Sequence, residues 1–266
     1  MAFRTRSFAG AFARRLSAVS FFDSVVLFGA ALLISVLPFV ILLSSLANHH
    51  IDTDISRHIG LNGQGASIVG QLFRSTPSHS WAAIVTGLIF ATAGTVTVAS
   101  SLQVIYERIF GQPHRGWKDV FRFITWVAVL FGVLVADSVI SGPARIVATP
   151  VGVAGFFWWT MRFLLAGRVS WRFLLRPAIV TALLWIGLEA FSSVYFSAQI
   201  ISDSKLYGPI GVVFSLMVWF IAIGAVIVLG AAAGATWAEH ASAARQVSLR
   251  IACGVTRTRQ APAGRA

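Results

Sequence analysis

The sequence predicts an all-α, polytopic membrane protein with six transmembrane helices and with both termini in the cytoplasm. Composition supplies the first observation: 57% of the residues are hydrophobic and only 11% are charged, whereas a soluble domain carries about 25% charged residues. The second is a mean hydropathy of +0.80. The third is the placement of Lys and Arg along the chain, which decides the number of helices. A soluble globular domain and a disordered chain are therefore excluded.

Six apolar stretches are long enough to cross a bilayer, whose hydrocarbon core of about 30 Å takes roughly 20 helical residues. They are residues 24–46, 81–105, 121–140, 146–166, 177–196 and 210–237. The fourth stretch is the least regular, since Pro150 lies near its start and Arg162 near its end. We predict one transmembrane domain over residues 1–240, followed by a basic cytoplasmic tail over 241–266 that is partly disordered.

The basic residues decide whether the fourth stretch spans, because short cytoplasmic loops collect Lys and Arg. With six spans, 17 of the 21 Lys and Arg lie on the cytoplasmic side and 4 lie outside; without the fourth span, the numbers are 9 and 12. Six spans are therefore predicted. The net charge of +12 then follows the topology rather than forming one patch. We expect contact with membrane lipids and no nucleic-acid partner.

Two acidic residues within the apolar stretches are the candidates for a polar site. An ionisable side chain at the centre of a span costs roughly 2.5–3.5 kcal/mol on insertion scales. Asp137 lies near the outer end of the third stretch, and Glu189 lies deeper, in the fifth. Arg145, just beyond the third stretch, is a candidate partner. These residues form an ion or substrate site facing an outer cavity, or alternatively a structural ion pair.

Helix packing and bending have their own signals. Pro38, inside the first stretch, frees a backbone carbonyl and is a hinge candidate. Small residues at four-residue spacing predict close helix contacts within the bundle, with a homo-oligomer interface as the alternative. They are Gly87, Ala91 and Thr95 in the second stretch, and Gly230 and Gly234 in the sixth.

Catalytic and cofactor motifs are missing from the sequence. It contains no nucleophile elbow, phosphate-binding loop or zinc-protease helix, and Cys253 is its one cysteine. We therefore predict no catalytic residues, no metal and no cofactor. Histidines and aspartates gather in the long connection after the first stretch, where a solvated loop is the interpretation and a metal site the alternative. They are His49, His50, Asp52, Asp54 and His58.

The last third of the chain carries a recognisable pattern. Tyr207-Gly208-Pro209 enters the last stretch, which ends in Leu229-Gly230-Ala231, and the first stretch reads Leu32-Leu33-Ile34-Ser35-Val36-Leu37-Pro38. This pattern resembles the YihY/BrkB family of bacterial inner-membrane proteins. The family continues Leu-Gly-Ala with Glu and then Asn two residues later, where this chain has Ala232 and Gly234. A polar role at that inner helix end is not expected here.

The resemblance implies a multi-pass protein of the bacterial inner membrane that is not an enzyme. Together with the intramembrane acids, it implies a transporter or flippase-like protein that moves or accommodates a lipid or other amphipathic substrate. A structural or partner-binding envelope protein without transport is the alternative. An old ribonuclease label also attaches to the family, but the sequence offers no residues that support nuclease activity.

Overall fold

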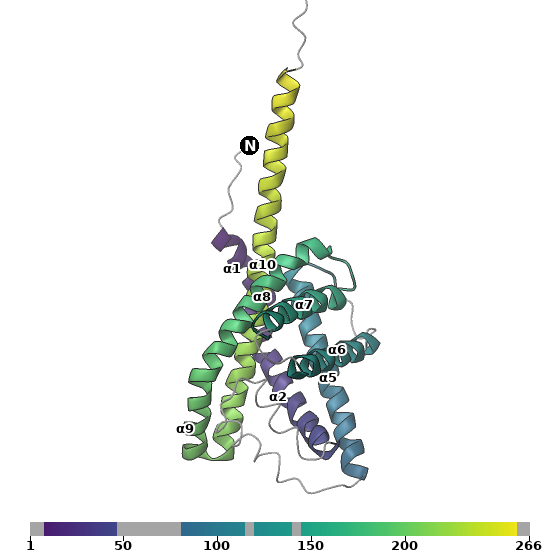
Figure 1. Cartoon of the computed structure of the whole chain (residues 1–266), viewed down its shortest axis with the longest axis vertical. Helices are drawn as coiled ribbons and strands as arrows, with labels where there is room; N and C mark the ends of the chain where they lie inside the picture. The colour runs from purple at the N-terminus through teal and green to yellow at the C-terminus, as the bar shows by residue number, and fades with distance from the viewer. Residues whose placement is uncertain (1–7, 47–80, 115–119, 140–144, 260–266) are drawn as a thin grey trace, which may run out of the picture.

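The computed structural model describes residues 8–46, 81–114, 120–139 and 145–259. Over these ranges the chain is helical and contains no strand, so the all-α prediction is confirmed for them (Figure 1). Each predicted apolar stretch lies in a helix over most of its length, but the fourth extends two residues beyond the end of its helix at Leu164, and residue 140 of the third lies outside the described residues. The helices that contain them are α2 (Phe21–Leu46), α5 (Trp81–Ile109), α6 (Val120–Val139), α7 (Arg145–Leu164), α8 (Trp171–Phe191), continued by the π-helical turn η2 (Ser192–Phe196), and α10 (Pro209–Arg259).

Three helical parts were not predicted. A short helix, α1 (Phe8–Val19), precedes α2, and another, α9 (Ser197–Tyr207), stands between η2 and α10. The last helix continues beyond the apolar stretch as far as Arg259. Residues 241–259 of the basic tail are therefore an extension of α10, and Figure 1 shows this extension projecting far from the body.

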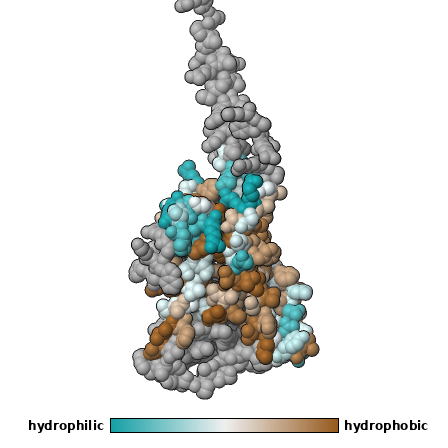
Figure 2. Space-filling view, turned by 180° about the vertical axis from the view of Figure 1, so that it is seen from behind, coloured by the Kyte–Doolittle hydropathy of each residue, from teal (hydrophilic) through white to brown (hydrophobic). Residues whose placement is uncertain are grey.

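Two helical segments are long and apolar enough to cross a membrane. They are Trp171–Phe196 and Ile210–Ser242. A third candidate is the pair formed by α1 and the first part of α2, which meet at a bend of 51°, so the described residues contain two or three candidate spans. Large apolar side chains face outward on these helices: Leu183, Phe214 and Val218 are each more than 60% exposed. Such a surface is typical of a membrane protein, and Figure 2 shows the hydrophobic region that covers the lower body.

The bend near the N-terminus lies at Ser20, between α1 and α2. Ser20 has φ 50°, in the left-handed region, where a helix of L-residues is interrupted. The backbone of α2 is helical through Pro38, and a hinge at this proline stays a prediction.

Glycines bring the long helices close together. A Cβ at Gly230 of α10 would lie 2.6 Å from Cα of Thr181 on α8, and Gly234 faces the backbone of Pro177 even more closely. Packing within the bundle is confirmed for Gly230 and Gly234, because α8 covers both. A second copy of the chain could not use this pair without displacing α8.

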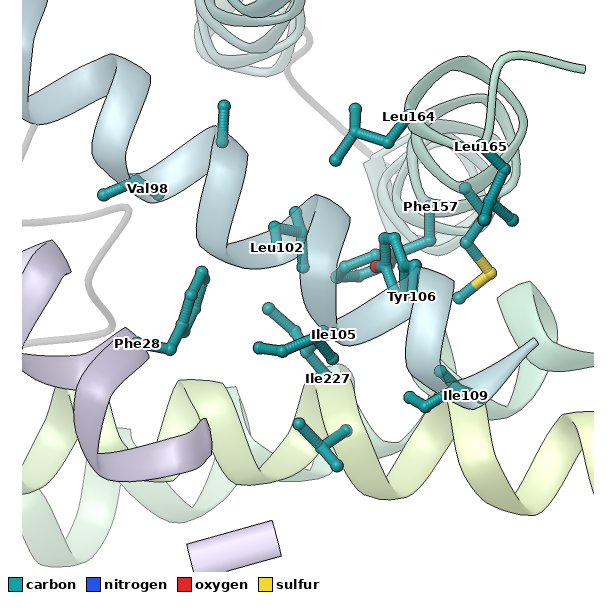
Figure 3. Close-up of a cluster of buried hydrophobic side chains, with 14 of the residues drawn as sticks. Phe28, Val98, Leu102, Ile105, Tyr106, Ile109, Phe157, Leu164, Leu165 and Ile227 are labelled. Carbon is teal, nitrogen blue, oxygen red and sulfur yellow. The ribbon is translucent and has the colours of Figure 1, made fainter. Parts of the chain in front are cut away.

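The remaining helices complete the body around this contact. Helix α2 packs against α5 and α10, and α7 packs against α8. In Figure 1, α6 and α7 lie across the direction of α8 and α10. The main core is centred on α5. Figure 3 shows Tyr106 pointing from α5 toward Phe157 of α7.

Four segments that are distant in the chain meet at one end of the body. Arg15 of α1 donates a hydrogen bond to the carbonyl of Ile109 at 2.9 Å and forms an ion pair with Glu239 of α10. Arg168, after α7, donates to the carbonyl of Pro113 at 2.8 Å. We call this region the basic end, comprising α1, residues 109–114, residues 165–170 and residues 238–240 of α10. Figure 2 shows hydrophilic residues gathered at the upper end of the coloured body.

Candidate functional site

A groove with polar and apolar walls opens near the basic end, between α2, α5 and α6. Its volume is about 230 Å³. The polar lining consists of Ser24, Ser100, Ser101, Gln103, Arg108 and His114. The apolar lining consists of Leu27, Phe28, Val104, Ile105 and Phe123. We refer to it as the polar groove.

The serine hydroxyls of the groove donate to their own helices. Ser100 and Ser101 both donate to the carbonyl of Thr97, at 2.9 and 2.8 Å, and Ser24 donates to the carbonyl of Val19 at 2.6 Å. A hydroxyl has one hydrogen and two acceptor positions. The hydroxyl oxygens therefore retain capacity to accept hydrogen bonds from a molecule in the groove.

A buried carboxylate lies next to the groove. Glu107 is only 3% exposed, and a buried charge without partners would be costly. Gln103 Nε2 donates to Glu107 Oε1 at 2.8 Å, from one helical turn earlier. His114 Nδ1 lies 2.9 Å from Oε2. Both carboxylate oxygens thus have a partner.

The turn after α5 positions His114 beside Glu107. Gly111 has φ 62°, a conformation that glycine adopts without steric cost. The amide of Gln112 donates back to the carbonyl of Glu107 at 2.8 Å, and the amide of Gly111 donates to that of Arg108. This pattern is a Schellman end, which reverses the chain. The reversal brings His114 back onto the last turn of α5.

Arg108 supplies a positive charge to the groove. It follows Glu107 on the helix, is exposed, and lines the hollow. Within the part of the chain that the structure describes, its guanidinium has no acidic partner and no hydrogen bond. Arg108 is therefore a positive charge of the groove that no acid among the described residues neutralises.

The acids predicted from the sequence lie elsewhere. Glu189, on α8, is half-buried, and its Oε1 accepts a hydrogen bond of 2.7 Å from Trp185 Nε1. Asp137 lies in α6 and Arg145 begins α7, but the side chains of both lie outside the described residues. The predicted outer cavity shared by Asp137 and Glu189 stays a prediction. The His and Asp residues between positions 49 and 58 are also outside the described part.

Glu107 was not predicted as a site residue, because the predicted apolar stretch stops at residue 105. Helix α5 continues to Ile109. A signal was present: Gln103 and Glu107 are four residues apart, the spacing at which polar side chains pair on a helix. The contact with His114 had no such signal, since it depends on the turn at Gly111.

The Tyr-Gly motif forms the corner between α9 and α10. Gly208 has φ 62° and ψ −143° and ends α9, while Tyr207 is 68% exposed. Asp203 strengthens the corner, since its carboxylate accepts from Ser215 at 2.6 Å and from Gln199 at 3.0 Å. The Tyr-Gly motif is thus a structural corner, and it lies at the end of the body opposite the basic end. Gly230, the third motif residue, packs against Thr181 of α8.

The fold and the groove define a helical membrane protein with a polar hollow at one end of its bundle. The model of the virulence factor BrkB family matches residues 28–250, and the chain belongs to this family. The resemblance carried by Tyr207, Gly208 and Gly230 is thereby confirmed. The BrkB family is not known as a family of enzymes. No curated protein and no solved structure matches the chain.

Proposed function

We propose that this protein is a multi-pass protein of the bacterial inner membrane that moves or accommodates an amphipathic molecule, such as a lipid, through the polar groove. The observation that carries the proposal is the mixed lining of the groove. Acceptor and charged side chains share one hollow with Leu27, Phe28 and Val104. A molecule with a polar head and an apolar chain satisfies both kinds of wall, whereas a fully polar solute satisfies only one.

The proposed topology has six spans and cytoplasmic termini. The contacts at the basic end support it: the N-terminal helix, the α5–α6 connection, the α7–α8 connection and the last helix end meet there. These are the four segments that the Lys and Arg distribution assigns to the cytoplasm. Two helices, α6 and α7, need a separate test because they lie across the direction of the other long helices.

The topology is tested by labelling a cysteine placed in the α6–α7 connection. Ser141→Cys is introduced into a Cys253→Ser background, and intact cells are treated with a membrane-impermeant maleimide. Six spans predict labelling of residue 141 from outside. A control cysteine at Arg172, after α7, should be labelled only after the cells are opened. Protection of residue 141 in intact cells, with labelling in opened cells, would contradict six spans.

The groove itself is tested by filling it. We expect Ser101→Phe to lower the movement of a fluorescent phospholipid across reconstituted vesicles by about tenfold, equivalent to a rise of roughly 1.4 kcal/mol in the barrier. Movement is read from the fraction of label reached by an impermeant reductant. The matched control is Ser193→Phe in η2, an exposed serine that also donates to its own helix. Equal flux in the two variants would contradict a role for the groove.

The two acids predicted within the apolar stretches are candidates for a second polar site along the route of the substrate. We propose that Glu189 and Asp137, with Arg145, contact a polar or cationic part of the substrate or a coupled ion. The bond from Trp185 supports this role for Glu189, because it holds the carboxylate in one orientation.

A second function, binding of a protein partner in the envelope, is favoured by the extension of α10. The helix continues to Arg259, well beyond the body. Removing residues 243–266 should then abolish capture of the partner while lipid movement in vesicles is unchanged. Loss of lipid movement in the truncated protein would count against an extension that serves only a partner.

A further inference from the structure

We propose that the polar groove binds the phosphate of a phospholipid whose head group also carries hydroxyl or ammonium donors, with Arg108 as the contact to the phosphate. This inference rests on the proposed function and deepens it, because it specifies the head-group chemistry. The phosphodiester of a glycerol or ethanolamine phospholipid has this combination of groups.

The charge of the groove selects an anion. Arg108 extends into the hollow without an acidic partner among the described residues. A guanidinium presents several donors in a planar fork that matches two oxygens of a phosphate. The neighbouring Glu107 does not compete for Arg108, since Gln103 and His114 occupy its oxygens and its side chain is buried.

His114 adds a ring nitrogen that can accept a hydrogen bond from a bound molecule, because the Nδ1 hydrogen is directed at Glu107. An ionised carboxylate can only accept, so the contact with Glu107 requires the hydrogen on Nδ1 of His114. The side chain is 63% exposed, which leaves the other face of the ring open to a bound molecule. Glu107 therefore acts as a positioning residue, holding His114 beside Arg108.

The hydroxyl oxygens select donors on the head group. The hydroxyls of Ser24, Ser100 and Ser101 donate their hydrogens to backbone carbonyls. Their oxygens line the groove as acceptors. Inorganic phosphate or sulfate at neutral pH offers these oxygens few donors. A glycerol hydroxyl or an ammonium group offers donors to them while the phosphate lies on Arg108.

The size and the apolar wall of the groove favour a lipid over a free anion. Its volume of about 230 Å³ is below the 300–1,000 Å³ of typical ligand pockets. It can hold a head group, while the chains lie outside it against the exposed apolar surface of α2, where Leu27 is 68% exposed. A free phosphate gains nothing from Leu27 or Val104.

The test measures lipid retention by the purified full chain in detergent micelles, using native mass spectrometry. The probes are phosphatidylglycerol, diacylglycerol, the water-soluble glycerophosphoglycerol and inorganic phosphate. We expect Arg108→Gln to lower the affinity for phosphatidylglycerol by about tenfold or more, as expected for a charge-assisted hydrogen bond. The matched control is Arg172→Gln, an exposed arginine at the start of α8 outside the groove, which should change the affinity less than about twofold. Wild-type protein should retain little diacylglycerol.

Three results would overturn the inference. Equal affinities in the two arginine variants would show that general surface charge holds the lipid. Competition by inorganic phosphate at the concentration at which phosphatidylglycerol binds would show a free-anion site. Binding of diacylglycerol as tight as that of phosphatidylglycerol would remove the role of the phosphate.

Two variants distinguish lipid binding in the groove from lipid movement through it. If Ser101→Phe stops lipid movement but Arg108→Gln binds phosphatidylglycerol normally, the groove is a transport path and the head-group assignment is wrong. If Arg108→Gln loses phosphatidylglycerol but Ser101→Phe moves lipid normally, the site binds lipid and the transport proposal is wrong.

Discussion

Arg15 and Glu239, 224 positions apart in the chain, form an ion pair that joins the first helix to the last. The same guanidinium donates to the carbonyl of Ile109, at the end of α5. One side chain therefore connects three helices at the basic end. Its side chain is only 18% exposed, whereas that of Glu239 is 51% exposed.

Removal of Arg15 should cost more than removal of Glu239. Glu239→Gln breaks a half-exposed ion pair, so we expect a loss below about 1 kcal/mol in unfolding free energy. Arg15→Ala also leaves the carbonyl of Ile109 without its donor, and we expect about 1–3 kcal/mol. Thermal unfolding in detergent micelles, with trypsin cleavage at Arg14 as a local readout, measures both. Equal effects of the two substitutions would show that the bond to Ile109 contributes nothing.

Tyr106→Phe should stabilise the protein. Tyr106 is fully buried, and among the described side chains its hydroxyl is a buried polar group without a hydrogen-bond partner. Removing an unsatisfied hydroxyl removes a desolvation cost of about 1–3 kcal/mol. The opposite sign is expected for Thr160→Val, which keeps the volume but deprives Trp126 Nε1 of its acceptor at 3.1 Å. A lower unfolding midpoint for Tyr106→Phe would indicate that the hydroxyl has an unseen partner, such as a buried water.

Gly230→Ala should destabilise the contact between α8 and α10. The added methyl group would lie 2.6 Å from Cα of Thr181, closer than any packed contact, so the helices must separate. Overpacking of this kind costs about 1–3 kcal/mol. The control is Gly187→Ala on α8, where a Cβ meets nothing within 4 Å. There, replacing a helical glycine should raise the unfolding free energy by roughly 0.5–1 kcal/mol. A decrease at both positions would point to a cause other than the close helix contact.

Glu189→Gln should reduce lipid movement without changing the unfolding midpoint. Glutamine keeps an oxygen that accepts from Trp185 Nε1, so the substitution removes the charge and retains the hydrogen bond. Asp137→Asn is the parallel change on α6. Flux in reconstituted vesicles and thermal unfolding are measured on the same preparations. A lower midpoint with normal flux would instead support the structural ion pair that the sequence left open.

Apolar stretches of about 20 residues predicted the long helices well, because burial in a membrane or a core demands that pattern. Helix α1 was not predicted by this criterion, because it contains Arg14 and Arg15 and is not a continuous apolar stretch. Its position depends on Glu239 and Ile109, which lie far away in the chain. The extension of α10 escaped for a similar reason, because a basic segment rich in Ala and Arg can continue a helix without being apolar.

The groove was harder to predict than the helices. Arg108 was counted from the sequence as a cytoplasmic charge, which says nothing about whether it meets an acid. Its availability depends on Glu107 being occupied by Gln103 and His114, and the latter contact requires the chain reversal at Gly111. Periodicity and hydropathy describe single helices. They contain no information on a hollow built from three of them.

The unbroken α10 gives the molecule a rigid lever. At about 1.5 Å per residue, its 51 residues extend roughly 76 Å, more than twice the thickness of a hydrocarbon core. The membrane-length part of α10 packs closely against α8 at Gly230 and Gly234. Because the helix is continuous, a tilt of α10 at this contact would displace Arg259 more than the residues beside the contact. The direction that α8 imposes on α10 at Gly230 and Gly234 therefore sets where Arg259 lies, far from the body.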